Sequence, residues 1–275
     1  MKKIALCLPV LLFVSVISFA QKTGKLALSK GQKFLQEING NVLITQSVMG
    51  QSIESKIDMA SVNTIEVKDI KDTGYSLTYT ITKLKMNMSA MGQDMNYDSD
   101  KKDNDSTMGK GMSKLLNNPK KVDIDLMGKV TNAAKDTNDT NTDGDMMSGL
   151  QSMLGNPDAF LIIPSKVKVG YSWSDSVNKD DTKSNTIYTI KELKGNDATV
   201  SVKGTMQVSQ KAQAQNMEFT TNSNGSFSGD LIVDTKTSVV KQRNSIVETT
   251  GTVDIMGQQI PMTTKVTSES IVKSM

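Results

Sequence analysis

The chain has 275 residues, of which 37% are hydrophobic, 22% charged and 4% aromatic, and its formal net charge of +3 gives no excess that would favour nucleic acid or an anionic membrane. It contains no histidine and one cysteine, which argues against disulfides, Ser-His-Asp triads and imidazole or thiolate zinc sites. Carboxylates, lysines, serines and tyrosines remain for catalysis, and no cofactor is indicated. We therefore expect a non-enzymatic protein.

Residues 1–20 have the pattern of a secretory signal peptide. Two lysines precede an apolar run from Ile4 to about Ile17, and the sequence "SFA" then gives a cleavage site with small residues at the required spacing. No later stretch approaches the ~18 apolar residues that would span a bilayer. The pattern predicts cleavage near Ala20 and a secreted or periplasmic mature chain that does not span the membrane.

Met-Gly-Gln occurs three times, in "SVMGQSI" at 47–53, "SAMGQDM" at 89–95 and "DIMGQQI" at 254–260. When Met-Gly is taken as a two-residue loop, the flanking residues pair as antiparallel strands with apolar side chains on one face and polar ones on the other. The glycine supplies the positive φ that such a loop needs. The apolar face is the candidate ligand surface and carries Ile44, Ile53, Met86, Met88, Met95, Tyr97, Val253 and Ile260, whereas the polar face carries Glu54, Lys85 and Lys265.

Two halves of the chain share a pattern that indicates an internal duplication. "VKDIK" at 67–71 matches "IKELK" at 190–194, and at the same spacing Tyr75, Leu77 and Tyr79 match Ala198, Val200 and Val202. We therefore expect a first β unit over 21–134 and a second over 157–275.

The segment between the halves differs in composition. Residues 98–106 and 135–145 are polar and rich in Asn and Asp, which indicates loops. Met108–Leu116 and Met146–Leu154 each have the pattern of a short helix. Residues 135–156 are therefore expected to be a polar loop followed by a short helix.

Phe160-Leu161-Ile162-Ile163-Pro164 indicates a buried strand that opens the second unit. Together these elements predict a mainly β protein of long antiparallel hairpins, with two short helices between the halves. The hairpins are expected to form either a half-open barrel or a sandwich.

A polar loop has part of a calcium-binding pattern. Asp139, Asn141, Asp143 and Asp145 offer oxygen ligands at alternate positions, as in the first half of a calcium loop. Leu150 stands where the closing bidentate acid is needed, so a solvated loop without an ion is the alternative.

Four methionines allow a second metal interpretation. The thioethers of Met86, Met88, Met91 and Met95 are ligands that copper(I) accepts. Without a histidine or cysteine partner they make a weak site, so we favour the apolar face of a hairpin.

Two further pairs have both structural and functional interpretations. Tyr171 and Trp173 alternate on one side of a strand and either stack on a ligand or anchor the core. Asp123 and Asp125 share a strand face, but this spacing is too common to indicate a catalytic pair.

The order of several motifs resembles a family of secreted, β-rich proteins of unknown function from Bacteroidota-type envelopes. The motifs are "SFAQ", "LSKGQKF", "YDSDKKDND", "VDIDLMGKV", "FLIIPSKVKVGYSW" and "GDLIVDTKTSVVKQ". More distantly, the repeated hairpins around an apolar concave face are similar to the half-barrels of periplasmic lipoprotein-carrier proteins. The resemblance implies a fold but no functional residue.

We expect a binding protein that holds an apolar ligand, such as a lipid or acyl group, on a concave β face, because a methionine-rich face can repack around varied shapes. The alternative is a structural or protein-interaction module of the cell envelope, in which the apolar faces close on each other.

Overall fold

The computed structural model describes residues 26–48, 50–90, 92–101, 107–133, 159–179, 181–214, 217–255 and 257–275. The predicted signal peptide, the calcium-like loop and the helix predicted at 146–154 lie outside these residues. The described elements are β1 (Lys33–Val48), β2 (Gln51–Lys71), β3 (Gly74–Ala90), β4 (Gln93–Asp98), α1 (Thr107–Leu115), β5 (Lys120–Asp125), β6 (Val130–Ala133), β7 (Ser172–Asn178), β8 (Thr182–Lys194), β9 (Asp197–Ala214), β10 (Met217–Asp234), β11 (Val240–Ile255) and β12 (Gln258–Ser274).

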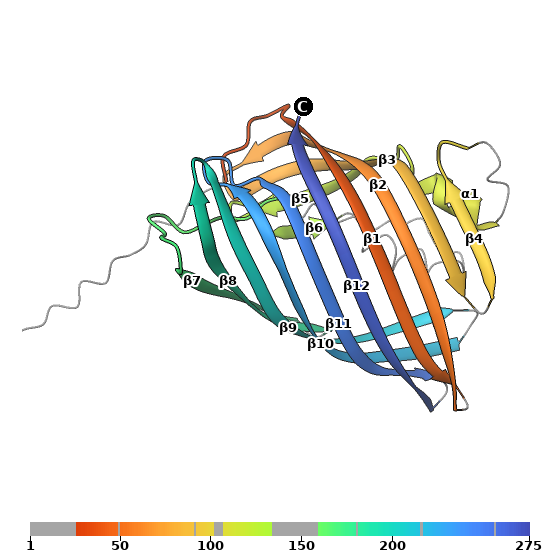
Figure 1. The fold of residues 1–275 in the computed structure, drawn as a ribbon. Coiled ribbons are helices and arrows are strands. Elements are labelled where there is room, and N and C mark those ends of the chain that lie inside the picture. The colour runs from red at the N-terminus through yellow and green to blue at the C-terminus, as the bar shows by residue number, and fades with distance from the viewer. Residues whose placement is uncertain are drawn as a thin grey trace, which may run out of the picture.

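The described strands form one antiparallel sheet in the order β6-β5-β3-β2-β1-β12-β11-β10-β9-β8-β7, and β4 pairs with β3. The sheet curls without closing, so that β5 and β6 lie behind β1 and β12 in Figure 1. This confirms a mainly β fold of the half-open type, rather than a sandwich. The helix expected at 108–116 is present as α1. We call the face that carries Phe34 and Val42 the inner face, and its reverse the outer face.

The three Met-Gly hairpins have the predicted register. Val48 pairs with Gln51, Ala90 with Gln93, and Ile255 with Gln258, which leaves a two-residue loop in each case. The loop glycines have φ angles of 79°, 75° and 86° at Gly50, Gly92 and Gly257, where a side chain would be strained. The loop methionines themselves lie outside the described residues.

The hydrophobic core lies at the end of the sheet opposite to these hairpin tips. Its larger cluster covers the inner face of β1, β2, β3 and β5 and includes Leu26, Leu28 and Met112 of α1. A smaller cluster covers β8 to β11 and includes Ile163. Phe34 of β1 meets Phe160 edge-on, with ring centroids 5.7 Å apart. One end of the sheet is therefore packed, whereas the long strands continue well beyond it.

The predicted strand at 160–164 is not present, although the burial predicted for this segment is confirmed. Phe160, Ile162 and Ile163 are all buried, but only Phe160 forms a bridge, to Val239. The segment packs across the inner face beside the β10–β11 turn, and it has isolated bridges at Phe160 and Pro164 instead of a continuous ladder. These residues are buried because they pack on the sheet. An apolar run in the sequence does not distinguish packing on a sheet from pairing within it.

The matching motifs of the two halves occupy equivalent hairpins. The β2–β3 ladder shifts register at Val67/Asp69, within "VKDIK", and the β8–β9 ladder shifts at Ile190/Glu192, within "IKELK". Each motif then runs into a tight turn to the next strand. The two hairpins thus have a register shift at matching positions, the duplication itself stays a prediction, and the strands of both halves belong to one sheet.

Glycines inside the strands allow the sheet to curve. Gly204 of β9 pairs with Phe227 of β10, and a Cβ at Gly204 would overlap the ring of Phe227. A Cβ at Gly225 would overlap the backbone oxygen of Glu248 on β11. Glycine in a strand interior permits such close approach and bending, and β9 and β10 bend on the way to their shared tip (Figure 1).

The β10–β11 turn is held by one carboxylate. Asp234 accepts hydrogen bonds from the backbone N–H groups of Lys236 and Thr237, both at 2.9 Å, and the Nζ of Lys241 lies 3.3 Å from it. Burial raises the pKa of Asp234, but the hydrogen bonds from Thr237, Lys236 and Lys241 lower it more, so the pKa lies below its ordinary value. The turn thereby places Val239 against Phe160.

We predict that Gly225→Ala lowers the free energy of unfolding by about 1–3 kcal/mol, because the added methyl group forces the β10 and β11 backbones apart. Urea unfolding of the purified protein measures this change. Ser226→Ala, at an exposed outward position on the same strand, is the control and should change stability by less than about 0.5 kcal/mol. If Gly225→Ala and Ser226→Ala lowered the free energy of unfolding equally, this would contradict the close approach of the β10 and β11 backbones at Gly225.

We predict that Asp234→Asn destabilises the protein at neutral pH and that its deficit relative to the wild type shrinks in acid. Because the folded-state pKa of Asp234 is lowered, its contribution is complete above the unfolded-state pKa of about 3.9 and is lost as pH falls through the folded value. The urea unfolding midpoints of the wild type and of Asp234→Asn, measured between pH 7 and about pH 3, report this loss. A pH-independent deficit for Asp234→Asn would refute the assignment.

Candidate functional site on the inner face

Strand alternation gives the inner face an apolar row that crosses the sheet. Val42 pairs with Ile57 on one side and Val266 on the other, so their side chains share a face. This row of side chains continues across the sheet on both sides of β1. From β4 to β10 it contains Met95, Met88, Ile57, Val42, Val266, Val247 and Phe227.

The outer face carries the charges that the pattern predicted there. Lys265 contacts Glu248 at 2.9 Å, and Lys85 contacts Asp98 at 3.3 Å. Hydrogen bonding to Asp98 and its negative charge raise the pKa of Lys85. Glu54 is exposed as well. The two faces therefore differ in chemistry along the full length of the hairpins.

Six of the eight predicted ligand-face residues are half-buried on the inner face toward the hairpin tips. Met88 pairs with Met95, and Val253 pairs with Ile260, so these form two local pairs on different hairpins. Ile44 lies on the central strand β1. The six residues are Ile44, Ile53, Met88, Met95, Val253 and Ile260.

The other two predicted residues, Met86 and Tyr97, lie in the larger core cluster. They are 1% and 2% exposed, respectively. The hydroxyl of Tyr97 lies 3.3 Å from the Ser113 hydroxyl of α1. They share the inner face with Met88 and Met95, but they lie where α1 packs on the sheet.

A cavity of about 620 Å³ opens on the inner face of β7 to β11. The β5–β6 turn and residues 160–162 form its other wall. Three apolar side chains in its lining remain 37–39% exposed, and these are Met127, Val130 and Val177. The cavity thus has both apolar and polar side chains in its lining, and several of the apolar ones are accessible to solvent.

Aromatic side chains form a stack at one side of this cavity. Tyr171 and Trp173 have ring centroids 6.2 Å apart, and Trp173 and Tyr188 have centroids 5.1 Å apart with an interplanar angle of 15°. All three pack against the smaller core cluster. This favours the core-anchor interpretation of Tyr171 and Trp173, although Trp173 and Tyr188 also line the cavity.

The charged groups of the cavity come from both edges of the sheet. Lys129 of the β5–β6 turn contacts both carboxylate oxygens of Asp175 on β7, at 2.7 and 2.8 Å. This ion pair connects the two edges that the curl brings together. Lys179 and Arg243 also line the cavity.

Arg243 is a site residue that our reading of the sequence missed. It is the only arginine of the chain and lies on β11. It is four residues before Val247, which the third hairpin places on the apolar face, and residues of equal parity on a strand share a face. This periodicity was the signal that could have found it.

Asp123 and Asp125 have structural partners. Asp123 lies 3.2 Å from the Nζ of Lys71. Asp125 accepts hydrogen bonds from the backbone N–H groups of Met127 and Lys129 in the β5–β6 turn, at 2.8 and 2.9 Å. The two carboxylates therefore have different partners, although the Oδ1 of Asp123 is buried without a hydrogen bond.

The predicted metal sites receive no geometric support. Asp139, Asn141, Asp143 and Asp145 lie outside the described residues, and so does Met91 of the thioether group. Within the described ranges, no three His, Cys, Asp or Glu residues gather closely enough to hold a metal ion.

The part of the chain that the structure describes contains no helix with the length and hydropathy needed to cross a membrane.

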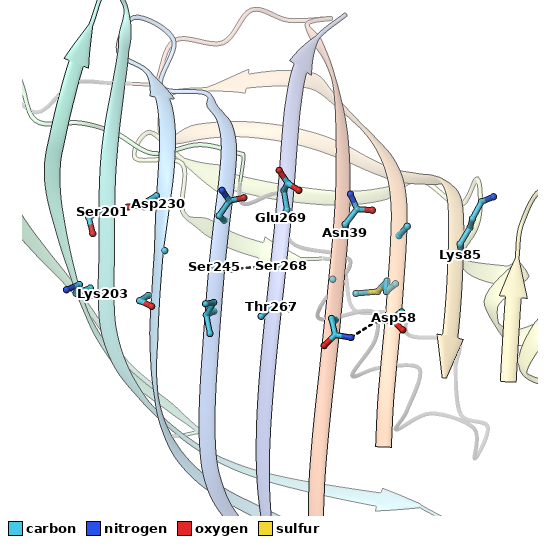
Figure 2. Close-up of a pocket in the computed structure, with 18 of the residues that line it drawn as sticks. Asn39, Asp58, Lys85, Ser201, Lys203, Asp230, Ser245, Thr267, Ser268 and Glu269 are labelled. Atoms are coloured by element: carbon cyan, nitrogen blue, oxygen red, sulfur yellow. Dashed lines mark hydrogen bonds between the residues drawn. The ribbon is translucent and has the colours of Figure 1, made fainter. Parts of the chain in front are cut away.

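The outer face has a larger groove, of about 940 Å³, that crosses β3 to β8 (Figure 2). Asp58 accepts a hydrogen bond of 2.5 Å from Asn41, and this bond, followed by one from Lys56, lowers the pKa of Asp58. The lining includes cations and carboxylates in equal number, which are Lys85, Lys191, Lys203, Asp58, Asp230 and Glu269. The groove is therefore open to solvent, and the charged groups in its lining carry no net charge.

The solved structures show what this fold is similar to. The sheet resembles lipovitellin, in a structure titled "Lipid-protein interactions in lipovitellin", with a TM-score of 0.50 and 13% identity over 90% of this chain. The chain spans 25% of that lipovitellin chain. An outer membrane channel from Pseudomonas putida F1 also matches over 90% of this chain and 97% of its own, but at 6% identity and a TM-score of 0.27.

No curated protein matches the sequence. A family model does match residues 72–240, which is more than half of the chain and extends from the β2–β3 turn to the start of β11. The chain belongs to the family of unknown function DUF6263.

Proposed function

We propose that the protein is a non-enzymatic binding module, exported to the periplasm or the cell exterior of a Gram-negative bacterium, that holds the acyl chain of a lipid on the inner face of its sheet. The observation that carries the proposal is the accessible apolar surface of this face. Val42 is buried at 5% exposure, whereas the inner residues beyond it toward the tips, such as Ile44 and Ile53, are only half-buried.

Water contact with this surface is unfavourable, and a bound acyl chain would relieve it. Removing apolar surface from water contributes roughly 25 cal/mol per Å². Contiguous apolar patches on a protein surface commonly mark a site of interaction. Met88 and Met95, with their flexible thioethers, suit a ligand of variable shape.

The inner cavity has the dimensions and lining of a ligand site. Its volume of about 620 Å³ lies within the ~300–1,000 Å³ that is usual for small-molecule pockets. The likeness to lipovitellin, whose structure title names lipid–protein interactions, supports the geometry of an apolar half-open sheet. At 13% identity it supports the fold and not a particular ligand.

Export and the lack of catalysis belong to the same proposal. The apolar run with its small-residue cleavage pattern at 1–20 supports export. The chain's lack of histidine, and the structural partners of Asp123 and Asp125, support a binding role rather than a catalytic one.

The outer groove favours a second candidate function, a protein-interaction or structural module of the envelope. Its amide, hydroxyl and balanced charged groups offer hydrogen bonds and ion pairs to the surface of another protein. In that case the inner face would bind no lipid at all, and this distinguishes the two candidates.

We predict that protein isolated from its native compartment carries a bound lipid. Native mass spectrometry should show the chain, cleaved near Ala20, with an added mass that organic solvent removes. A chain that is consistently bare would support the second candidate instead. An intact N-terminus would remove the basis for export.

We predict that Val177→Asn weakens binding of a fluorescent acyl probe about five- to tenfold. Val177 lines the cavity at 37% exposure, so the change costs roughly 1 kcal/mol of apolar contact with the ligand and little folding stability. Ile187→Asn, at 49% exposure on the outer side of the adjacent strand β8, is the matched control and should leave affinity unchanged. Equal losses in the two variants would argue against the inner cavity as the site.

A further inference from the structure

We propose that three neighbouring turns at the packed end of the sheet form a docking surface for an anionic lipid bilayer. They are the segment 166–170 before β7, the end of β8 with the β8–β9 turn at 193–196, and the β10–β11 turn at 235–237. We call this surface the turn patch. The inference goes beyond the proposed function, because none of these residues lines the inner cavity.

Backbone hydrogen bonds hold the three parts of the turn patch together. The N–H of Gly170 donates to the carbonyl oxygen of Ile190 on β8, at 2.8 Å. The N–H of Thr235 donates to the carbonyl oxygen of Asn196, also at 2.8 Å, and the Thr235 hydroxyl donates to the same oxygen at 3.0 Å. Because β8 and the turn that follows it are bonded to the other two segments, the three present one continuous surface.

Two large apolar side chains of the turn patch are exposed to solvent. Val169 is 58% exposed and Leu193 is 41% exposed. Removing such side chains from water is favourable, so both would gain from contact with hydrocarbon. Exposed apolar side chains are common on protein surfaces. The charges around these two therefore decide which partner they fit.

The turn patch has an excess of unpaired cations. Of its carboxylates, Asp197 and Asp234 both contact the Nζ of Lys241, at 2.6 and 3.3 Å, whereas the exposed Glu192 has no ion pair within the described chain. Against this one carboxylate stand four exposed lysines that likewise form no ion pair with a described residue. They are Lys166, Lys168, Lys194 and Lys236.

Each exposed apolar residue is next to one of these lysines in the sequence. Val169 follows Lys168, and Leu193 precedes Lys194. A bilayer surface offers hydrocarbon and anionic headgroups at neighbouring depths, so an apolar side chain can enter it while the adjacent ammonium group stays among the headgroups. β7 begins at Ser172, directly after the patch, and its Trp173 lines the inner cavity. Docking would therefore bring the β7 side of that cavity close to a source of lipid.

Flotation of the purified protein with two kinds of vesicle tests the assignment. One kind is phosphatidylcholine alone, and the other contains about one-third phosphatidylglycerol, which makes its surface anionic. At low ionic strength we expect the wild type to partition at least about tenfold more strongly onto the anionic vesicles. Salt at about 0.5 M should remove most of this preference, because it screens charges beyond a few ångström.

Four variants locate the contact. Lys168→Gln and Lys194→Gln should each weaken binding to the anionic vesicles about fivefold, since one lysine near such a surface contributes roughly this factor. Leu193→Ser should weaken it by about the same factor, through lost apolar contact. The matched controls lie on the outer face, away from the turns, and should bind as the wild type does. They are Ile246→Ser, at 43% exposure, and Lys203→Gln, at an exposed lysine without an ion pair to a described residue.

Urea unfolding shows whether each variant is folded, and the salt dependence of the wild type tests the charges without any substitution. Leu193→Ser should leave the affinity for a fluorescent acyl probe within about twofold, so loss of docking is distinguishable from loss of the inner site. Equal partition of the wild type onto the two kinds of vesicle would overturn the inference, as would equal losses in the patch variants and the controls. If the wild type bound neither kind of vesicle, a bilayer would be the wrong partner, whereas the acyl probe would still decide the proposed function.

Discussion

The antiparallel pairing of β1 with β12 is the constraint on which the rest of the structure depends. It joins Phe34 to Ser274 at one end and Gln46 to Met262 at the other, so the first and last strands lie side by side in the middle of the sheet. Without this ladder each half would be a separate curved sheet with its own apolar face. With it, the inner rows of both halves become one surface, and Phe34 can pack against Phe160 from the second half.

The lengths of the strands explain why this surface is only partly covered. β2 has 21 residues and β12 has 17, whereas strands in globular proteins commonly have about 5–6. Three segments cover the end of the sheet near the tight turns. They are Leu26 to Leu28, helix α1, and Ala159 to Ile163. Toward the tips the strands are held by their hydrogen-bond ladders, and the inner face alternates Val, Ile and Met with Ser, Thr and Gly. Such a face mixes apolar and polar side chains, and it remains partly exposed.

Much of the local structure could be predicted from the sequence because it depends on neighbours in the chain. The three Met-Gly hairpins and helix α1 follow from turn chemistry and side-chain periodicity over short segments. The β1–β12 pairing depends on residues at opposite ends of the chain, and no local pattern specifies it. The same limit applies to Met86 and Tyr97. Their alternation places them on the apolar face, but only the position of α1 shows that they are packed in the core.

The charged groups of the inner cavity also come from parts of the chain that are far apart in the sequence. Lys129 of the β5–β6 turn and Asp175 of β7 belong to different halves, and they meet only because the sheet curls until its two edges approach each other. Arg243 is on a central strand, where alternation alone determines the face on which it lies. The curl therefore brings charged and apolar side chains from both halves of the chain around one cavity.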